Sequence, residues 1–205
     1  MANFFDFNDA EEQQAGGLLP AKTLVKVVSK IQPGGEGHGG YETISASEFQ
    51  YLKMEFTVVS SPYAGRKIFQ NVGIGGVTDG HAKAASISRS LIRAMLESGH
   101  GIEPKDETDK ARKVRCISGW ESIDELEFAV EVGIEKGKDG YEDRNKIQRV
   151  ITPDHAQYKN IMAGNTVLPE GGAKSYAAKN AAATPPWEAD AASKQQKSAV
   201  PEWAR

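Results

Sequence analysis

The amino-acid sequence predicts a mainly β fold, a small five-stranded barrel with one helix between its third and fourth strands and a disordered C-terminal tail. Several segments between residues 18 and 151 alternate apolar and polar residues, as strands with one buried face do. One segment, 79–99, instead repeats its apolar residues with a helical period. After about residue 164 bulky apolar residues become rare.

Composition indicates one folded domain with extensions, because 205 residues with 39% apolar and 26% charged content are ordinary for a globular chain of this size. The formal charge of −3 gives no overall preference for nucleic acid, so any basic surface must be local. No run approaches the roughly 20 apolar residues that cross a bilayer, and the acidic N-terminus is unlike a signal peptide. We therefore expect a cytoplasmic protein without a membrane partner. The single cysteine, Cys116, is expected to be a small buried hydrophobe.

Period-2 patterns and β-branched residues define the strands. The predicted strands are residues 18–31, 49–59, 66–73, 125–135 and 144–151. In the second strand the apolar residues Leu52, Met54, Phe56 and Val58 share one face, and Phe49, Tyr51 and Lys53 share the other. The segment 32–47 holds five glycines and is predicted to be a long mobile loop.

The helix predicted over 79–99 has a buried stripe formed by Ala84, Ile87, Leu91 and Met95, and Gly99 is its expected C-terminal stop. Residues 102–115 are predicted to be a charged connector or short helix.

Changes in composition divide the chain into three parts. Residues 1–17 form an acidic arm that contains phenylalanines, 18–163 form the barrel domain, and 164–205 form a tail rich in Ala, Lys and Pro. The tail has too few apolar residues to offset the entropy of ordering it, which favours disorder. Trp187 and Trp203 lie in this tail and are candidate anchors for a protein partner.

Enzymatic motifs are missing from the sequence. The histidines His38, His81, His100 and His155 lack the i, i+4 spacing that would join two of them on one metal. No serine lies in a nucleophile-elbow pattern. We therefore predict a protein that is not an enzyme and needs neither a metal nor a cofactor.

Aromatic and basic residues gather instead on the second and third predicted strands. Single-stranded nucleic acid needs this combination, because bases stack on aromatic rings while cations neutralise phosphates. The candidates on the second and third strands and their turn are Phe49, Tyr51, Lys53, Tyr63, Arg66, Lys67 and Phe69. Arg89 and Arg93 on the helix and Arg144, Lys146 and Arg149 on the last strand could extend the basic track. The competing interpretation is that aromatics such as Phe49 and Phe69 belong to the core.

Five strands, a helix after the third, a long first loop and an aromatic-basic hairpin together suit the oligonucleotide-binding (OB) fold, which binds its ligand across its second and third strands. The sequence also resembles small single-stranded DNA-binding proteins encoded by tailed bacteriophages. The resemblance lies in "LLPAKTLVKVV", "YLKMEFTVVSSPYAGRKIF" and "FAVEVGIEKGKDGYEDRNKIQRVITP", and in the acidic N-terminus and the "AASISRSLIRAMLES" helix. It covers roughly residues 1 to 160.

This resemblance implies an OB-fold barrel, sequence-tolerant binding of single-stranded DNA, and a role in phage replication or recombination in the cytoplasm of a host cell. Bacterial single-stranded DNA-binding proteins often end in an acidic tail with a hydrophobic tip that recruits partners. This chain departs from that pattern, because residues 171–205 hold five basic and three acidic residues.

Two alternatives to DNA binding stay open. The first is an adaptor that recruits replication or recombination proteins through Trp187 and Trp203. The second is a small metal-dependent nuclease whose site is assembled in space from scattered acids and histidines. Oligomeric state and the preference between DNA and RNA are also open.

Overall fold

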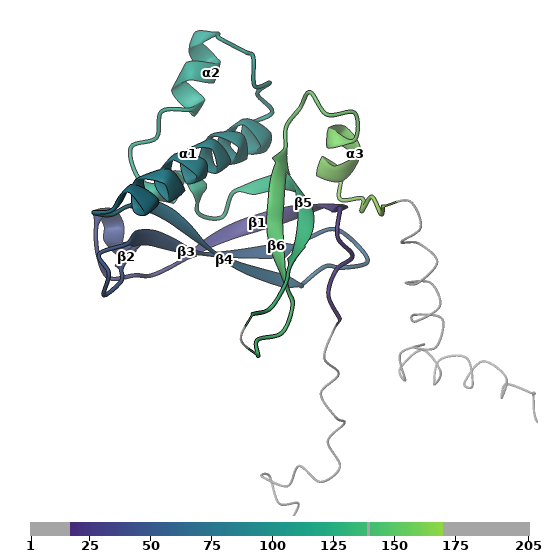
Figure 1. Ribbon diagram of the computed structural model, residues 1–205. Coiled ribbons are helices and arrows are strands. Elements are labelled where there is room, and N and C mark those ends of the chain that lie inside the picture. The colour runs from purple at the N-terminus through teal and green to yellow at the C-terminus, as the bar shows by residue number, and fades with distance from the viewer. Residues whose placement is uncertain (1–16, 139, 170–205) are drawn as a thin grey trace, which may run out of the picture.

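A computed structural model describes residues 17–138 and 140–169, and within them six antiparallel strands form one curved sheet. The strands are β1 (Thr23–Gln32), β2 (Glu42–Ile44), β3 (Gln50–Val58), β4 (Lys67–Gly75), β5 (Glu127–Glu135) and β6 (Arg144–Ile151). The helices are α1 (Asp79–His100), α2 (Asp109–Val114) and α3 (Tyr158–Met162), with single 3₁₀ turns η1 (His38–Gly40) and η2 (Trp120–Ile123). Figure 1 shows α1 lying over one side of the sheet and the β5–β6 loop projecting on the opposite side.

β1 is the centre of the sheet, since it pairs with both β3 and β5. β3 continues the sheet to β4, and β5 continues it to β6. The strand order, with a helix after β4, is consistent with an OB-like fold. Two features differ from the predicted five-stranded barrel. There is an additional strand, β2, and in the described part of the chain no backbone ladder joins β4 to β6, so the barrel is open there.

The additional strand comes from the glycine-rich segment that was expected to be a mobile loop. Its chain folds back on itself: Glu36 and Glu42 exchange backbone hydrogen bonds of 3.1 and 2.9 Å. A Cβ on Gly34 would lie 1.9 Å from the carbonyl oxygen of Glu42, so only glycine permits this approach. The fold-back positions β2 beside residues 50–52 of β3, just beyond the end of β1.

The core lies between the inner face of the sheet and the C-terminal half of α1. Alternate β3 residues Leu52, Met54, Phe56 and Val58 are all buried, as their spacing predicts. The Phe56 ring meets Phe128 of β5 edge to face, with ring centroids 6.0 Å apart. Ile92, Met95 and Leu96 of α1 complete this cluster.

The predicted stripe of α1 is wrong at its N-terminal end, because Ile87 is 65% exposed. The buried side chains of α1 begin at Ser88 and concentrate after Ile92, so the C-terminal half of the helix packs on the sheet. The helix ends at His100, and its C-terminal cap is Gly101 instead of the predicted Gly99; the φ of 67° at Gly101 favours glycine. Gly99 is required for packing instead, since a Cβ there would lie 2.6 Å from Leu126 Cδ1.

The C-terminal limit of the folded unit differs from the predicted one. Residues 165–167 contact the sheet, with bridges from Val167 to Leu24 and from Asn165 to Ser61, so the folded unit extends past its predicted end at 163.

Cys116 is exposed after α2, because the α2 segment turns only Ala111 fully inward, and it is therefore not the buried hydrophobe predicted. Residues 1–16 of the predicted arm (1–17) and residues 170–205 of the predicted tail (164–205), with Trp187 and Trp203, lie outside the described residues.

Candidate nucleic-acid interface

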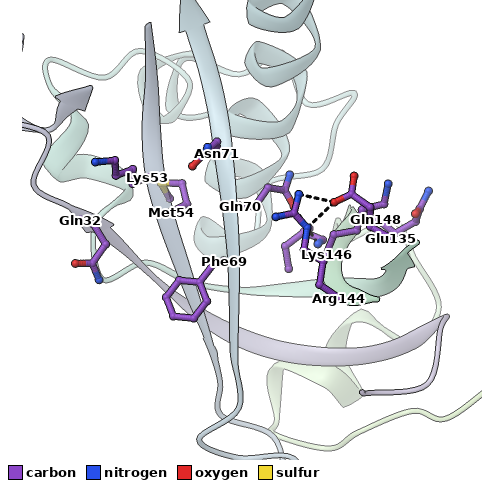
Figure 2. Close-up of a pocket in the computed structure, with 11 residues that line it drawn as sticks. Gln32, Lys53, Met54, Phe69, Gln70, Asn71, Glu135, Arg144, Lys146 and Gln148 are labelled. Atoms are coloured by element: carbon purple, nitrogen blue, oxygen red, sulfur yellow. Dashed lines mark hydrogen bonds and ion pairs between the residues drawn. The ribbon is translucent and has the colours of Figure 1, made fainter. Parts of the chain in front are cut away.

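The opening between β4 and β6 forms a groove of 560 Å³, here called the central groove (Figure 2). Its lining comes from the end of β1, from β3 and β4 on one side, and from β5 and β6 on the other. The lining residues are Gln32, Lys53, Met54, Phe69, Gln70, Asn71, Glu135, Arg144, Lys146, Ile147 and Gln148. The Gln70 side chain spans the opening, where its Oε1 accepts a hydrogen bond of 3.1 Å from the backbone N–H of Ile147.

Strand register brings Lys53 and Phe69 to the same face. Lys53 is opposite Asn71 in the β3–β4 ladder, and Phe69 is two residues from Asn71, so all three side chains point outward. The Phe69 ring is 58% exposed, so a large part of its surface is accessible to a ligand. In Figure 2 this ring projects clear of its strand, with Lys53 on one side of it and Arg144 and Lys146 on the other.

The charges in the central groove are mostly positive. Arg144 donates to Glu135 at 2.6 Å, and the pKa of Glu135 is lowered first by this hydrogen bond and then by nearby positive charges that include Lys146. Lys53 and Lys146 form no ion pair with any carboxylate in the described part of the chain. These two ammonium groups are therefore the cations most available to a phosphate.

Two further grooves adjoin the central groove through Arg144, which lines all three. The terminal groove (380 Å³) is lined by Gly17, Leu18, Leu19, Arg66, Lys67, Ile68, Phe69, Asp143, Arg144 and Asn145. The hairpin groove (470 Å³), at the β5–β6 loop, is lined by Glu135, Lys136, Gly137, Lys138, Tyr141, Glu142 and Arg144. Together the described lining residues of the three grooves include seven basic and three acidic side chains. A chain of net negative charge thus concentrates positive charge at one opening.

Arg66 and Lys67 lie in the terminal groove, and each already has a protein partner. Arg66 Nη1 donates to the carbonyl oxygen of Gly17 at 2.5 Å. Lys67 Nζ lies 2.7 Å from Oε1 of Glu55, whose side chain is only 8% exposed on the outward face of β3. The hydrogen bond from Lys67 is the largest cause of the lowered pKa of Glu55. Part of the charge of Lys67 is therefore used within the protein.

Phe49 and Tyr51 form an aromatic pair at the other end of the outward face of β3. Their rings are stacked with centroids 5.5 Å apart, and the ring of His81 from α1 lies 5.0 Å from that of Phe49. Gly73 of β4 makes room for Phe49, since a Cβ there would lie 2.6 Å from the ring. Tyr51 and Lys53 are two residues apart on one strand face, so this pair continues the surface of the central groove.

The remaining predicted site residues lie elsewhere. Tyr63 is 2% exposed and belongs to the core, because the turn after β3 folds the ring inward, so its predicted role in stacking bases is wrong for this structure. Arg93 pairs with the buried Glu97 and donates to the carbonyl oxygen of Pro104, which fixes α1 to the following loop. Arg149 pairs with Glu131 at 2.9 Å, and Arg89 lies in a separate groove on α1. None of these three lines the central, terminal or hairpin groove.

Sequence reasoning missed several groove residues. Tyr141 is 82% exposed beside Lys138 in the β5–β6 loop, and it is not among the predicted site residues. An aromatic residue close to lysines in this loop was the signal, because OB folds use the loop between their last two strands for binding. The amides Gln32, Asn71 and Gln148 also line the groove, and no sequence pattern marked them.

The described residues contain no cluster of three or more His, Cys, Asp or Glu side chains that could hold a metal ion. Across the same residues, no helix is both long and apolar enough to cross a membrane.

No protein-family model matches the chain, and no curated protein matches it. Among solved structures, the chain is similar to yeast RPA bound to ssDNA, with a TM-score of 0.26, 10% sequence identity, and coverage of 76% of this chain and 89% of that chain. A similarity of this size does not by itself indicate a shared function.

Proposed function

We propose that this protein binds single-stranded DNA without strong sequence preference and is not an enzyme. One observation carries the proposal: the exposed Phe69 ring lies in a groove between Lys53 on one side and Lys146 with Arg144 on the other (Figure 2). An exposed ring offers a base a stacking surface, and flanking cations at the same opening offer phosphates their counter-charges.

The physical requirements of single-strand binding match this groove. Stacking one base on an aromatic side chain contributes about 1–3 kcal/mol and tolerates any base, because every base has a π-face. Phe69 provides one such surface, the Phe49–Tyr51 pair a second, and Tyr141 a third at the β5–β6 loop. Lys53, Lys146 and Lys138 would pair with the phosphates of the strand that runs between these aromatic surfaces. The position of the grooves across the second and third barrel strands and beside the loop of the last two strands is where OB folds bind oligonucleotides.

A role in phage DNA replication or recombination, in the cytoplasm of a host cell, is the biological setting that we propose. The sequence resemblance to phage-encoded single-stranded DNA-binding proteins supports this part of the proposal. Recruitment of a replication or recombination protein by Trp187 and Trp203 stays a prediction.

Titration of fluorescent oligonucleotides by anisotropy tests the function. Single-stranded DNA, duplex DNA and single-stranded RNA of matched length would each be titrated at two salt concentrations. We expect binding of single strands to exceed that of duplex, and its logarithm to fall with log salt by about 0.7 for each phosphate contact. Failure to bind single strands at low salt, or equal binding of duplex, would overturn the proposal. Cleavage of labelled strands in Mg²⁺ or Mn²⁺ would overturn its non-enzymatic part.

A further inference from the structure

The N-terminal end of the described chain is built into the basic opening. Leu19 is fixed to β6 by two hydrogen bonds with Asn145: its N–H donates to Oδ1 at 2.8 Å, and its carbonyl accepts from Nδ2 at 2.9 Å. On the β4 side, Arg66 holds the carbonyl oxygen of Gly17. Residues 17–19 therefore line the terminal groove between β4 and β6, and the preceding residues are tethered at that point.

The sequence that precedes Gly17 combines negative charges with aromatic rings, as does the single-stranded DNA that the grooves would bind. Residues 1–16, MANFFDFNDAEEQQAG, contain four acidic residues, three phenylalanines and no basic residue. The carboxylates of this segment can pair with Lys53 and Lys146 as phosphates would, and its phenylalanine rings can stack on Phe69 as bases would. Charge and ring content are thus complementary between the segment and the opening at which it is tethered.

The length of the N-terminal segment and its effective concentration near the groove also favour it as the occupant. The ten residues 7–16 span at most about 33–36 Å, which is ample to lay them along a groove whose near end is formed by Phe69 and Arg144. A tethered segment acts at an effective concentration of about millimolar, so weak individual contacts suffice.

We propose that residues 1–16 occupy the central groove of the free protein, so that single-stranded DNA has to displace them in order to bind. The part concerning DNA rests on the proposed function, whereas occupation of the groove by the segment does not. The proposal assigns Lys53 and Lys146 to the acidic side chains of the segment, and the Phe69 ring to its phenylalanines. Because these contacts are electrostatic and exposed, added salt weakens them together with DNA binding.

Two full-length variants with matched changes test the inference, each neutralising one aspartate and two glutamates. The arm variant carries Asp9→Asn, Glu11→Gln and Glu12→Gln; the tail control carries Glu188→Gln, Asp190→Asn and Glu202→Gln. Without DNA, the backbone amide NMR signals of Lys53, Phe69 and Lys146 are expected to shift in the arm variant and to stay in place in the tail control. With DNA at low salt, the arm variant is expected to bind about three- to tenfold more tightly than the tail control, a difference lost by about 0.5 M salt.

Unchanged groove signals in the arm variant, together with equal DNA affinity of the two variants, would overturn the inference. If neither variant nor the wild type binds DNA, the proposed function fails, and the NMR comparison without DNA still decides whether the segment occupies the groove.

Discussion

Removing the two unpaired cations of the central groove tests the phosphate contacts most directly. In the double variant Lys53→Gln, Lys146→Gln, each substitution removes an ammonium group that has no carboxylate partner among the described residues. If each lysine neutralises one phosphate, the slope of log affinity against log salt becomes shallower by about 1.4. The same relation gives an affinity loss of about 25-fold at 0.1 M salt and about fivefold at 0.3 M.

The matched control is Lys105→Gln, Lys110→Gln, which removes the same charge from exposed lysines on the side of the molecule that carries α2. Both double variants are expected to have free energies of unfolding within about 0.5 kcal/mol of the wild-type value, since none of the four lysines is buried. Anisotropy titrations at four or more salt concentrations supply the slopes. Equal slopes for the groove variant and the control would refute the assignment of Lys53 and Lys146 to phosphates.

Three further predictions concern single side chains. Phe69→Ala is expected to weaken DNA binding by about 1–3 kcal/mol without changing the salt slope, and Phe69→Tyr to retain binding, in the same titrations; an unchanged affinity for Phe69→Ala would remove the ring from the interface. Tyr63→Ala should lower the free energy of unfolding by about 3–5 kcal/mol in urea, because the ring is buried, whereas Tyr141→Ala should barely change it; similar losses for both would contradict the burial of Tyr63. The pKa of Glu55 is lower in the folded protein, so its carboxylate stabilises the fold above the ordinary glutamate pKa, and this contribution is lost as pH falls through the lowered value. Glu55→Gln should therefore make the unfolding free energy less dependent on pH in acid, and an identical pH profile would show that the Lys67 pair is not responsible.

Much of the fold could be predicted because it depends on local patterns. The alternation in β3 assigned Leu52 and Phe56 to the core, and the period of residues 79–99 indicated a helix; the structure agrees with both. Where local patterns were ambiguous, packing decided. Ile87 fits a helical stripe equally well, but only the later turns of α1 rest on the sheet, so it is exposed.

The candidate site was predictable only in part for the same reason. Lys53 and Phe69 followed from strand alternation. Tyr63 lies in a turn, where no period tells whether a ring points inward, and the structure buries it. The ion pairs were predictable to different degrees. Arg93 and Glu97 are four residues apart in the predicted helix, so their pairing follows from helical spacing, whereas Arg149 meets Glu131 only because β6 pairs with β5.

By itself, the sequence determined that the chain has amphipathic strands, one long helix and an outward face carrying aromatic and basic residues, because these follow from side-chain order along each segment. Tertiary structure alone decided that β4 and β6 separate, since that depends on how far the sheet curls before its edges meet. It is this separation that brings Lys146 and Arg144 within one groove with Lys53 and Phe69, and that leaves room for Leu19 at the same opening.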